Sequence, residues 1–420
     1  MVATSPQVPR FAALRHRNFT LLWSGLIVSN VGTWMQNVAQ GWLILQLTNS
    51  PLWLGLLGLS FAIPMLSLPL IGGAIADRVD RIRLLYLTQS GMAAGAIGLA
   101  ILTWTGKVQA WHILVAAFLG SALLAFDSPA RQALMPDLVP PRDLLNAMSL
   151  NAATYNGAAL LGPALAGVLL APLGAGSLFF INGVSFAAVL IALLLLRGVR
   201  RRAGGPAASL ARSMRAGLAY AWRTRLILAL LVLSSLVAVF GRSYQNLLPV
   251  FARDIWHAGP QGYGILLSSA GAGAIIGAFG LASLRKAGRQ GRLLVVSGVL
   301  FGLSISCFAV SHSFGLGVFF LFLSGLTSTV FGTVIATFLQ LEAPNELRGR
   351  VLSLYSITLI GLPSLGALAS GALAEWLGGL SGAPHAVLLG GLMALAIVIL
   401  LGRFFWLREM KTAVGEEPRD

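Results

Sequence analysis

The sequence predicts an all-α membrane protein with twelve transmembrane helices in two six-helix bundles and both termini in the cytoplasm. Three observations support this prediction: the composition, the spacing of the apolar runs and the distribution of the basic residues. Of the 420 residues, 57% are hydrophobic and only 10% are charged, and the mean hydropathy is +0.83. Soluble globular chains contain about 25% charged residues. The composition therefore excludes an ordinary soluble enzyme and a disordered chain alike.

Apolar runs of about 20 residues, the length that spans the hydrocarbon core of a bilayer, define the predicted helices. Three arginines precede the first run, as in a secretory signal, but that run is too long and lacks a small-residue cleavage site. We therefore expect it to remain as a helix. The twelve predicted spans are residues 19–47, 52–76, 84–104, 111–131, 147–172, 178–196, 226–250, 262–284, 293–311, 314–339, 351–375 and 385–403.

The basic residues indicate which side of the membrane each connection faces. If the amino terminus is cytoplasmic, 26 of the 29 Lys and Arg residues fall on the cytoplasmic side. Lys107 and Arg253 fall on the opposite side, and Arg242 lies within a span. This asymmetry follows the positive-inside rule and places both termini in the cytoplasm. The net charge of +16 therefore indicates membrane orientation, and we expect no nucleic acid partner.

The longest connection, residues 197–225, contains eight arginines and divides the spans six and six. It predicts a cytoplasmic segment 1–18, a bundle 19–196, a basic linker 197–225, a second bundle 226–403 and a tail 404–420. The bundles are expected to be duplicates, because the Gly-Ala pair at 73–74 and the Arg at 81 recur 204 residues later. Two such repeats in the same orientation would enclose a cavity at mid-depth, as in transporters.

The loop after the second span, residues 73–83, reads GAIADRVDRIR. A glycine, an Asp four residues later and spaced basic residues resemble the signature loop of the major facilitator superfamily at this position. Asp80 replaces the second glycine of the family and leaves the loop less free to adopt a positive φ. A simple cytoplasmic helix cap is the alternative interpretation. The matching residues are Gly73, Ile75, Asp77, Arg78 and Arg81, with Arg83 close to the last basic position.

Further segments extend this resemblance over the whole chain. The fifth span contains a motif similar to the helix-packing glycine and proline motif of exporters in the superfamily, namely Gly157, Gly162, Pro163 and Gly167. Residues 127–151 and 344–354 resemble the branch that includes enterobactin-type siderophore exporters and macrolide efflux pumps. The resemblance implies a proton-coupled antiporter of the bacterial inner membrane that works by alternating access and needs no cofactor.

The resemblance also implies a charge relay at the cytoplasmic end, formed by the loop residues Asp77, Arg78, Arg81 and Arg83 with Asp127. The fourth span runs inward, and Asp127 stands about 24 Å along it at ~1.5 Å per residue. An unpaired carboxylate at membrane depth costs at least ~2.5–3.5 kcal/mol, so Asp127 needs a partner. We expect that partner to be Arg81, in a latch that breaks when the cavity opens inward. A static ion pair is the alternative.

Polar residues at helical spacing are candidates for the lining of the cavity. On the first span they share one face, although hydrogen bonds between helices are an alternative explanation. Tyr155 and Tyr355 are candidate aromatic walls. The remaining candidates are Asn30, Thr33, Asn37 and Gln40 on the first span, Tyr244 and Asn246 on the seventh, and Thr333 on the tenth.

Arg242 is the basic residue that lies deep within a predicted span. It stands about 24 Å along the seventh span, in the outer half of the membrane. A guanidinium there can bind a carboxylate, phosphate or catecholate through two hydrogen bonds. The alternatives are that Arg242 extends to the outer headgroups or pairs with Asp254.

The energy source is expected to be an ion gradient, because no glycine-rich phosphate-binding loop precedes a lysine. The five histidines lie near span ends or in loops, which leaves Asp127 as the candidate proton carrier by elimination. An arginine that many proton-coupled relatives carry in the fourth span is missing from residues 116–120. The expected partners are a small amphiphilic substrate, protons and membrane lipids, and we expect a monomer.

Three other functions were weighed against export. A flippase for a lysophospholipid or similar amphiphile has the same fold and suits the apolar composition equally well. A membrane enzyme is disfavoured, because no two histidines lie close together and no acidic cluster shares one depth. A receptor or scaffold is also disfavoured. The polar face of the first span indicates a water-filled interior, and a scaffold does not need one.

Overall fold

The computed structural model describes residues 11–76, 78–198, 218–283 and 290–413, and these ranges are helical with no strand. The first half contains α1 (Arg17–Thr48), α2 (Pro51–Ser67), α3 (Pro69–Ala76), α4 (Arg81–Trp104), α5 (Ala110–Leu138) and α6 (Leu144–Leu195). The second half contains α8 (Arg225–Gly241), α9 (Tyr244–Val250), α10 (Gly259–Ser283), α11 (Gln290–Val310), α12 (Phe314–Glu342), α13 (Asn345–Ile360), α14 (Leu362–Trp376) and α15 (Ala383–Ala413). Short helical turns lie at Ala12–Arg15, Pro141–Asp143, Phe251–Ile255 and Gly379–Gly382, and residues 218–223 are also helical.

Several predicted spans are interrupted. α2 ends at Ser67 and α3 begins at Pro69, whose ring cannot continue the hydrogen bonding of a helix. The predicted seventh span is divided into α8 and α9 and ends in a π-helical turn, Phe251–Ile255. The predicted eleventh span is divided at Gly361 into α13 and α14. Such interruptions are typical of binding sites in transporters.

α6 reverses direction within its 52 residues. Gly174 adopts a left-handed φ of 73°, which glycine tolerates without steric cost, and breaks the helix there. Gly162 packs against Trp34, whereas Asn182 lies against Gly32, two residues earlier on α1. Because residues 162 and 182 meet neighbouring turns of α1, the two arms of α6 must lie side by side. This reversal agrees with the separate spans 147–172 and 178–196 that the sequence predicts.

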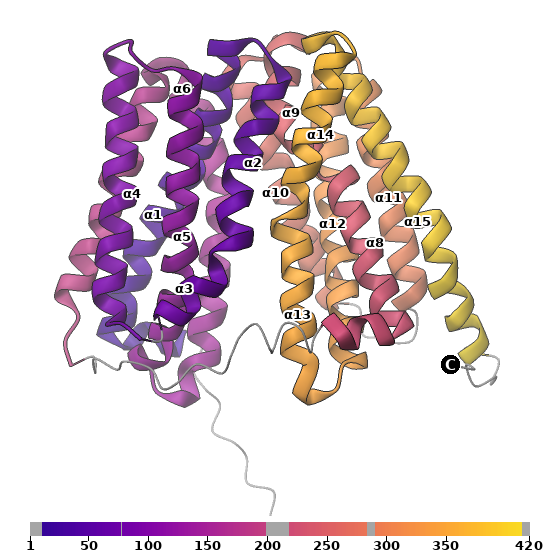
Figure 1. The fold of residues 1–420 in the computed structure, drawn as a ribbon, viewed down its shortest axis with the longest axis horizontal. Helices are drawn as coiled ribbons and strands as arrows, with labels where there is room; N and C mark the ends of the chain where they lie inside the picture. Colours follow the sequence, from indigo (N-terminus) through magenta and orange to yellow (C-terminus); the bar gives the residue numbers. More distant parts are fainter. Residues whose placement is uncertain (1–10, 77, 199–217, 284–289, 414–420) are drawn as a thin grey trace, which may run out of the picture.

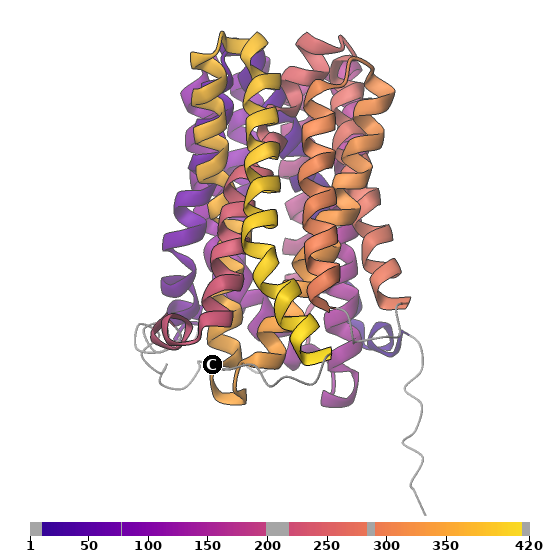
Figure 2. The ribbon, with the colours of Figure 1, turned by 90° about the vertical axis from the view of Figure 1, so that its right-hand side faces the viewer.

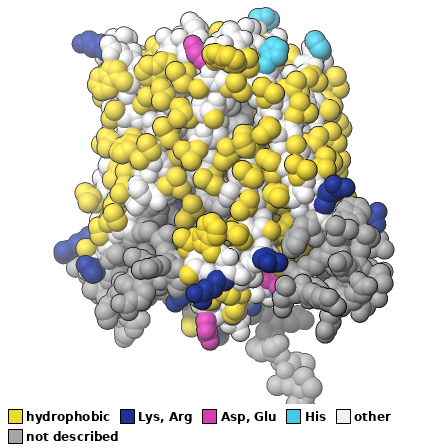
Figure 3. All heavy atoms as spheres, turned by 45° about the vertical axis from the view of Figure 1, so that its right-hand side comes forward, with side chains coloured by type: hydrophobic (Ala, Val, Ile, Leu, Met, Phe, Trp, Pro, Cys, Tyr) yellow, Lys and Arg dark blue, Asp and Glu magenta, His cyan; other side chains and the backbone are white. Residues whose placement is uncertain are grey.

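Nine helical stretches in the described part of the chain are long and apolar enough to cross a membrane. The molecule also exposes many large apolar side chains, among them Phe279 at 73% and Leu87 at 69%. Figure 3 shows hydrophobic side chains covering the middle of one face. Such a continuous apolar surface is unfavourable in water and is the surface that a bilayer covers. The chain is therefore a multi-pass membrane protein.

The helices form two groups side by side. Figure 1 shows the first half of the chain on the left and the second half on the right, with helices running between the same two ends. Figures 1 and 2 place the described carboxyl-terminal end and the start of α1 at the lower end. Lys and Arg side chains gather toward this end in Figure 3. We call it the basic end, and the opposite one the far end. The predicted linker lies largely outside the described residues, although 218–223 are helical.

Candidate functional site

The loop between α3 and α4 carries the signature residues, of which Asp77 lies outside the described part of the chain. Arg78 is exposed, and Arg83 stands 3.9 Å from the Asp80 carboxylate. Asp80 begins α4: its Oδ1 accepts hydrogen bonds from the backbone N–H groups of Ile82 and Arg83 at 2.9 and 3.3 Å. Asp80 has a φ of −60°, so this position does not require glycine. The residue that departs from the family pattern is therefore a helix cap.

Arg81 does not pair with Asp127 in this structure. Its Nη1 donates to the Asp137 carboxylate at 3.0 Å and to the Ala133 carbonyl at 2.9 Å. These partners come within reach because α5 continues to Leu138, beyond the predicted end at residue 131. Asp137 lies ten residues after Asp127, about 15 Å further along a helix. The ion pair at the basic end therefore joins α4 to α5 within the first half.

Asp127 occupies a separate, deeper site between α5 and α4, and its side chain is fully buried. Its Oδ1 accepts hydrogen bonds from Thr88 Oγ1 at 3.0 Å and from Gln89 Nε2 at 2.8 Å. Its Oδ2 lies 3.6 Å from the Arg131 guanidinium, one helical turn away, and no described residue gives it a hydrogen bond. Sequence reasoning missed Thr88 and Gln89, although adjacent polar residues within an apolar span were an available signal.

Arg131 connects this buried site to α6. Its side chain is 19% exposed, whereas Tyr155 on α6 is 58% exposed. The guanidinium is close enough to act electrostatically on the Tyr155 phenol. Tyr155 also packs edge-on against Trp34 of α1, with ring centroids 6.1 Å apart. The first half thus presents an aromatic residue beside an arginine whose carboxylate partner is buried.

The predicted polar face of α1 divides into residues with different roles. Asn30 and Thr33 bond backbone carbonyls of their own helix four residues earlier, at 2.7 and 2.9 Å. Such bonds satisfy the side chains without any cavity. Asn37 is exposed. Of these three residues, Asn37 is thus the one whose side chain is most exposed.

Two glutamines of α1 are buried or bridge to a neighbouring helix. Gln40, a predicted cavity residue, is 4% exposed, and its Nε2 has no hydrogen-bond partner among the described residues. Gln36, which sequence reasoning missed, accepts a hydrogen bond from Asn182 of α6 at 2.8 Å. The alternative weighed for this face, hydrogen bonding between helices, therefore applies to Gln36.

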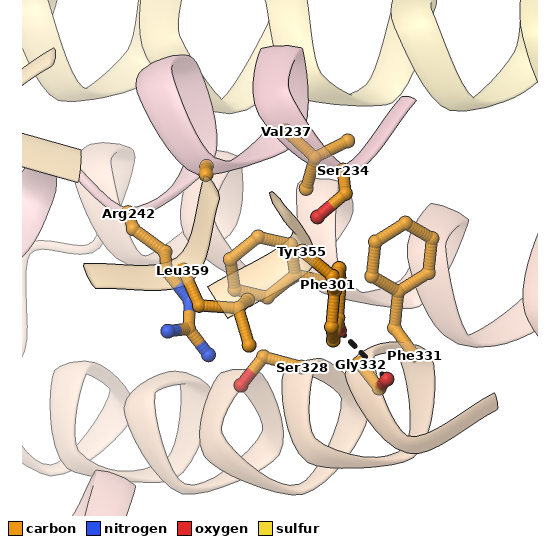
Figure 4. A pocket seen from close by; sticks show the side chains of 10 residues that line it. Ser234, Val237, Arg242, Phe301, Ser328, Phe331, Gly332, Tyr355 and Leu359 are labelled. Carbon is orange, nitrogen blue, oxygen red and sulfur yellow. Dashed lines mark hydrogen bonds between the residues drawn. The ribbon is translucent and has the colours of Figure 1, made fainter. Parts of the chain in front are cut away.

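Arg242 lies at the interruption between α8 and α9, directly after the last residue of α8. It lines a small pocket that is partly open to the surroundings. In the described part of the chain, no carboxylate or hydrogen-bond acceptor is bound to its guanidinium. Figure 4 shows the guanidinium directed toward Ser328 and beside Leu359. Arg242 is thus a cation with no counterion among the described residues, and it lies at a break in a membrane-spanning helix.

The other walls of this pocket are mostly apolar. Phe301 and Phe331 face it from α11 and α12, and Tyr355 of α13 crosses it (Figure 4). The Tyr355 hydroxyl donates to the Gly332 carbonyl at 2.7 Å, which fixes the ring in place. Gly361, where α13 ends, follows soon after Leu359 of the pocket wall. The pocket therefore adjoins interruptions in two spans and combines one charge with aromatic and aliphatic walls.

The remaining predicted cavity residues do not all reach this pocket. Tyr244 is 3% exposed, and its hydroxyl is 3.2 Å from Ser324 Oγ, so it belongs to the core of the second half. Asn246 is half-buried and lies near Gly58 of α2. Thr333 is exposed. None of these three lines the Arg242 pocket.

Asp254 does not pair with Arg242, which was the alternative weighed for that residue. Its carboxylate oxygens each accept from Arg253 Nε at 3.0 Å. Arg253 also donates through Nη1 to the Leu45 carbonyl at the end of α1, at 2.9 Å. Ser50 donates to the Glu375 carboxylate at 2.7 Å. These two hydrogen bonds join the two halves at the far end.

Close helix contacts at the far end involve the glycine and proline motif of α6. A Cβ at Gly167 would lie 2.9 Å from the Gly264 Cα of α10, so this contact between the halves needs glycine. A Cβ at Gly162 would collide with Trp34 of α1, whereas one at Gly157 would meet open space. The backbone carbonyl of Pro163 lies against Gly264. The motif therefore lies at helix contacts except at Gly157.

Comparisons with known proteins identify relatives of the whole chain. The model of a family described as transmembrane secretion effector matches residues 8–419. The chain is 28% identical over 350 residues to the staphyloferrin A transporter of Staphylococcus aureus, covering 83% of this chain and 87% of that protein. It is 24% identical to macrolide efflux protein A of Streptococcus pyogenes, over 86% and 90%. It is 25% identical to the enterobactin exporter of Citrobacter koseri, over 73% of each chain.

The fold is similar to that of solved major facilitator transporters. A bacterial homolog of the human lysosomal transporter Spinster, in an inward-facing and unoccupied conformation, matches with a TM-score of 0.73. The match covers 96% of this chain and 99% of that one at 14% identity. These comparisons confirm the predicted resemblance to the superfamily and to its siderophore and macrolide exporters. The relatives are transporters and not enzymes.

Proposed function

The chain belongs to the transmembrane secretion effector family of major facilitator transporters, and we propose that it is a secondary active exporter of small amphiphilic molecules. One observation carries the proposal. Arg242, which has no described partner, faces an apolar pocket where two spans are interrupted. Interrupted helices are where many secondary transporters bind their substrates. Drugs and siderophore-like compounds are the proposed cargo, since two relatives are a staphyloferrin A transporter and a macrolide efflux protein.

The proposed topology has twelve membrane crossings with both termini in the cytoplasm of a bacterium and the spans in its inner membrane. The stretch Pro141–Leu195 is a single apolar stretch by length but reverses at Gly174, so it supplies two crossings. α1, with its polar face, and the interrupted pair α2 and α3 supply two more. The clustering of Lys and Arg at the basic end supports a cytoplasmic location for that end.

Alternating access would operate between the two halves, and we assign this structure to the state that would open to the cytoplasm. Two of the hydrogen bonds that join the halves lie at the far end, from Arg253 to Leu45 and from Ser50 to Glu375. A third, from Ser268 of α10 to the Leu160 carbonyl, lies deeper. At the basic end, Arg81 and Asp137 bond within one half. Opening to the outside would require the far-end contacts to break.

The substrate would carry an anionic group that binds Arg242 and an apolar body that packs on the aromatic walls. A guanidinium can give two parallel hydrogen bonds to a carboxylate, phosphate or catecholate. Such bonds would supply the counterion that the protein does not provide. Asp127, the fully buried acid within a described span, would carry the proton that drives export.

Transport in proteoliposomes tests this function directly. Purified protein would be given a macrolide or a catecholate siderophore with and without an imposed pH gradient. We expect the gradient to accelerate transport several-fold and Asp127→Asn to remove that acceleration. Glu346→Gln, at an exposed position, is the matched control and should keep it. A substrate flux that does not change with the pH gradient would contradict proton antiport. Transport of labelled lysophospholipid, with no transport of the other two substrates, would indicate a flippase.

A further inference from the structure

Gln89 of α4 lies against Asp127 in the buried site between α4 and α5. We propose that Gln89 and Asp127 form an acid–amide pair in this conformation, with a proton on Asp127 Oδ2 that is donated to Gln89 Oε1. This inference rests on the proposed role of Asp127 as proton carrier. It adds Gln89 as a positioning residue and assigns the proton to one oxygen.

Two buried atoms without partners support the pairing. Asp127 Oδ2 and Gln89 Oε1 are both buried acceptors, and neither receives a hydrogen bond from any described residue. They belong to two groups that are already joined, since Gln89 Nε2 donates to Asp127 Oδ1 at 2.8 Å. An unsatisfied buried acceptor is costly, at roughly 1–3 kcal/mol, and native structures contain few. A single proton between these two atoms would satisfy both.

The chemistry of the two groups matches such a proton. A primary amide has donors on nitrogen and an acceptor on oxygen, and a protonated carboxyl has the complementary acceptor and donor. The pair can therefore close a ring of two hydrogen bonds: Nε2–H to Oδ1, which is present, and Oδ2–H to Oε1. Loading is a transfer of a proton from hydronium to Oδ2, which releases water and changes no other bond.

Arg131 is the alternative partner when the proton leaves. Its guanidinium stands 3.6 Å from Oδ2, close enough for electrostatic attraction but outside hydrogen-bond distance. In the ionised state Arg131 would move into direct contact with Oδ2. The acid therefore has one partner for each protonation state: the Gln89 amide when neutral and the Arg131 guanidinium when charged.

Few other ionisable groups surround this site. α2 and α3, which pack on α5, contain no ionisable residue, and Asp77 after α3 lies outside the described residues. On α4, Arg81 is occupied by Asp137, and Tyr86 donates to the Leu190 carbonyl. α1 contributes only Arg17, at its first turn. From α6, Tyr155 approaches Arg131. Arg131 is therefore the ion that competes with the proton.

Infrared difference spectroscopy of the purified protein in lipid nanodiscs tests the pair without any transport measurement. A pH titration should produce a protonated-carboxyl C=O band that is absent from Asp127→Asn. Gln89→Leu removes one hydrogen bond from that C=O, so the band should move to higher frequency. Gln132→Leu is the matched control, because Gln132 is exposed and bonds only Ser128, at 3.3 Å. Its band should not move.

The outcomes separate this inference from the proposed function. An Asp127-dependent band that shifts in Gln89→Leu supports the pair, even if export ignores a pH gradient. A band that Gln89→Leu leaves in place, or no Asp127-dependent band at any pH, overturns it. If Gln89→Leu fails to fold, Gln89→Asn replaces it. The shorter amide cannot reach both oxygens, so the same upward shift supports the pair and its absence overturns it.

Discussion

Asp127 in the first half and Arg242 in the second are ionisable residues within spans, and their surroundings differ. In the first half, Arg81 is bound to Asp137, and Asp127 has Arg131 beside it. In the second half, Arg242 lines a pocket with no carboxylate among its walls. An ionisable side chain that has a partner in its own half can bind another ion only after that partner is displaced. A charge without one is available to a ligand.

This difference assigns separate tasks to the two halves. Moving a charge out of water is costly unless it is paired, so an unpaired guanidinium at membrane depth is retained against a penalty. Binding of a substrate anion to Arg242 would offset the free-energy cost of this unpaired charge. In the first half, Asp127 would hold a proton beside Gln89, and Arg131, 3.6 Å away, would become its partner when the proton leaves. On the proposed function, the substrate would bind to the second half and the first half would respond to the proton.

The largest expected effect is on substrate binding by Arg242→Ala. Charge-assisted hydrogen bonds contribute roughly 1.5–3 kcal/mol each, so affinity for a carboxylated amphiphilic dye should fall about ten- to hundredfold. The methyl ester of the same dye lacks the charge and should lose at most about twofold. Equilibrium binding to the detergent-solubilised protein measures both.

Arg242→Lys is the control that separates charge from geometry. Lysine keeps the charge but cannot make two parallel hydrogen bonds, so it should restore only part of the affinity for the carboxylate. Equal losses for the dye and its ester in Arg242→Ala would indicate that Arg242 supports packing. The contrast between the two halves would then fail.

A smaller effect is expected from separating Arg81 and Asp137. A double-mutant cycle with Arg81→Gln and Asp137→Asn should give a coupling energy of roughly 1 kcal/mol in thermal unfolding, because the pair is close and mostly buried. The control cycle with Arg83→Gln and Asp80→Asn should give almost none, since those charges are 3.9 Å apart and Arg83 is 78% exposed. Coupling between Arg81 and Asp127 instead of Asp137 would restore the pairing expected from sequence.

The sequence predicted an all-helical membrane chain with long apolar runs, because the length of such a run is set by bilayer thickness. It could not predict where a helix continues into a charged segment. α5 extends past its apolar run to Leu138, and this extension gives Arg81 a partner that was assigned to a loop. The sequence also could not predict the interruption at Gly361, because the residues on both sides of it are apolar and read as one continuous span.

The candidate site was predictable in part for a related reason. Periodicity identifies which residues share a face of one helix but not which helix that face meets. Arg242 was recognised because a charge inside a span is conspicuous. Tyr244 follows it closely in sequence but bonds Ser324 in the core, and Gln89 was overlooked because its role depends on α5. Contacts between distant helices are set by packing, which one sequence does not reveal.

The smallest expected effect is on the contacts that join the halves at the far end. Arg253→Gln removes the hydrogen bond to the Leu45 carbonyl, and a partly exposed bond of this kind contributes roughly 0.5–1.5 kcal/mol. The state open to the outside should therefore gain about threefold in population, measured by spin-label distances across that end after Cys307 is replaced. Lys107→Gln removes an exposed charge on the same side of the membrane and should leave the distances unchanged. If Arg253→Gln also leaves the distances unchanged, closure of the far end depends on helix packing rather than on Arg253. The close contact between the backbones of Gly167 and Gly264 would then be what holds the two halves together.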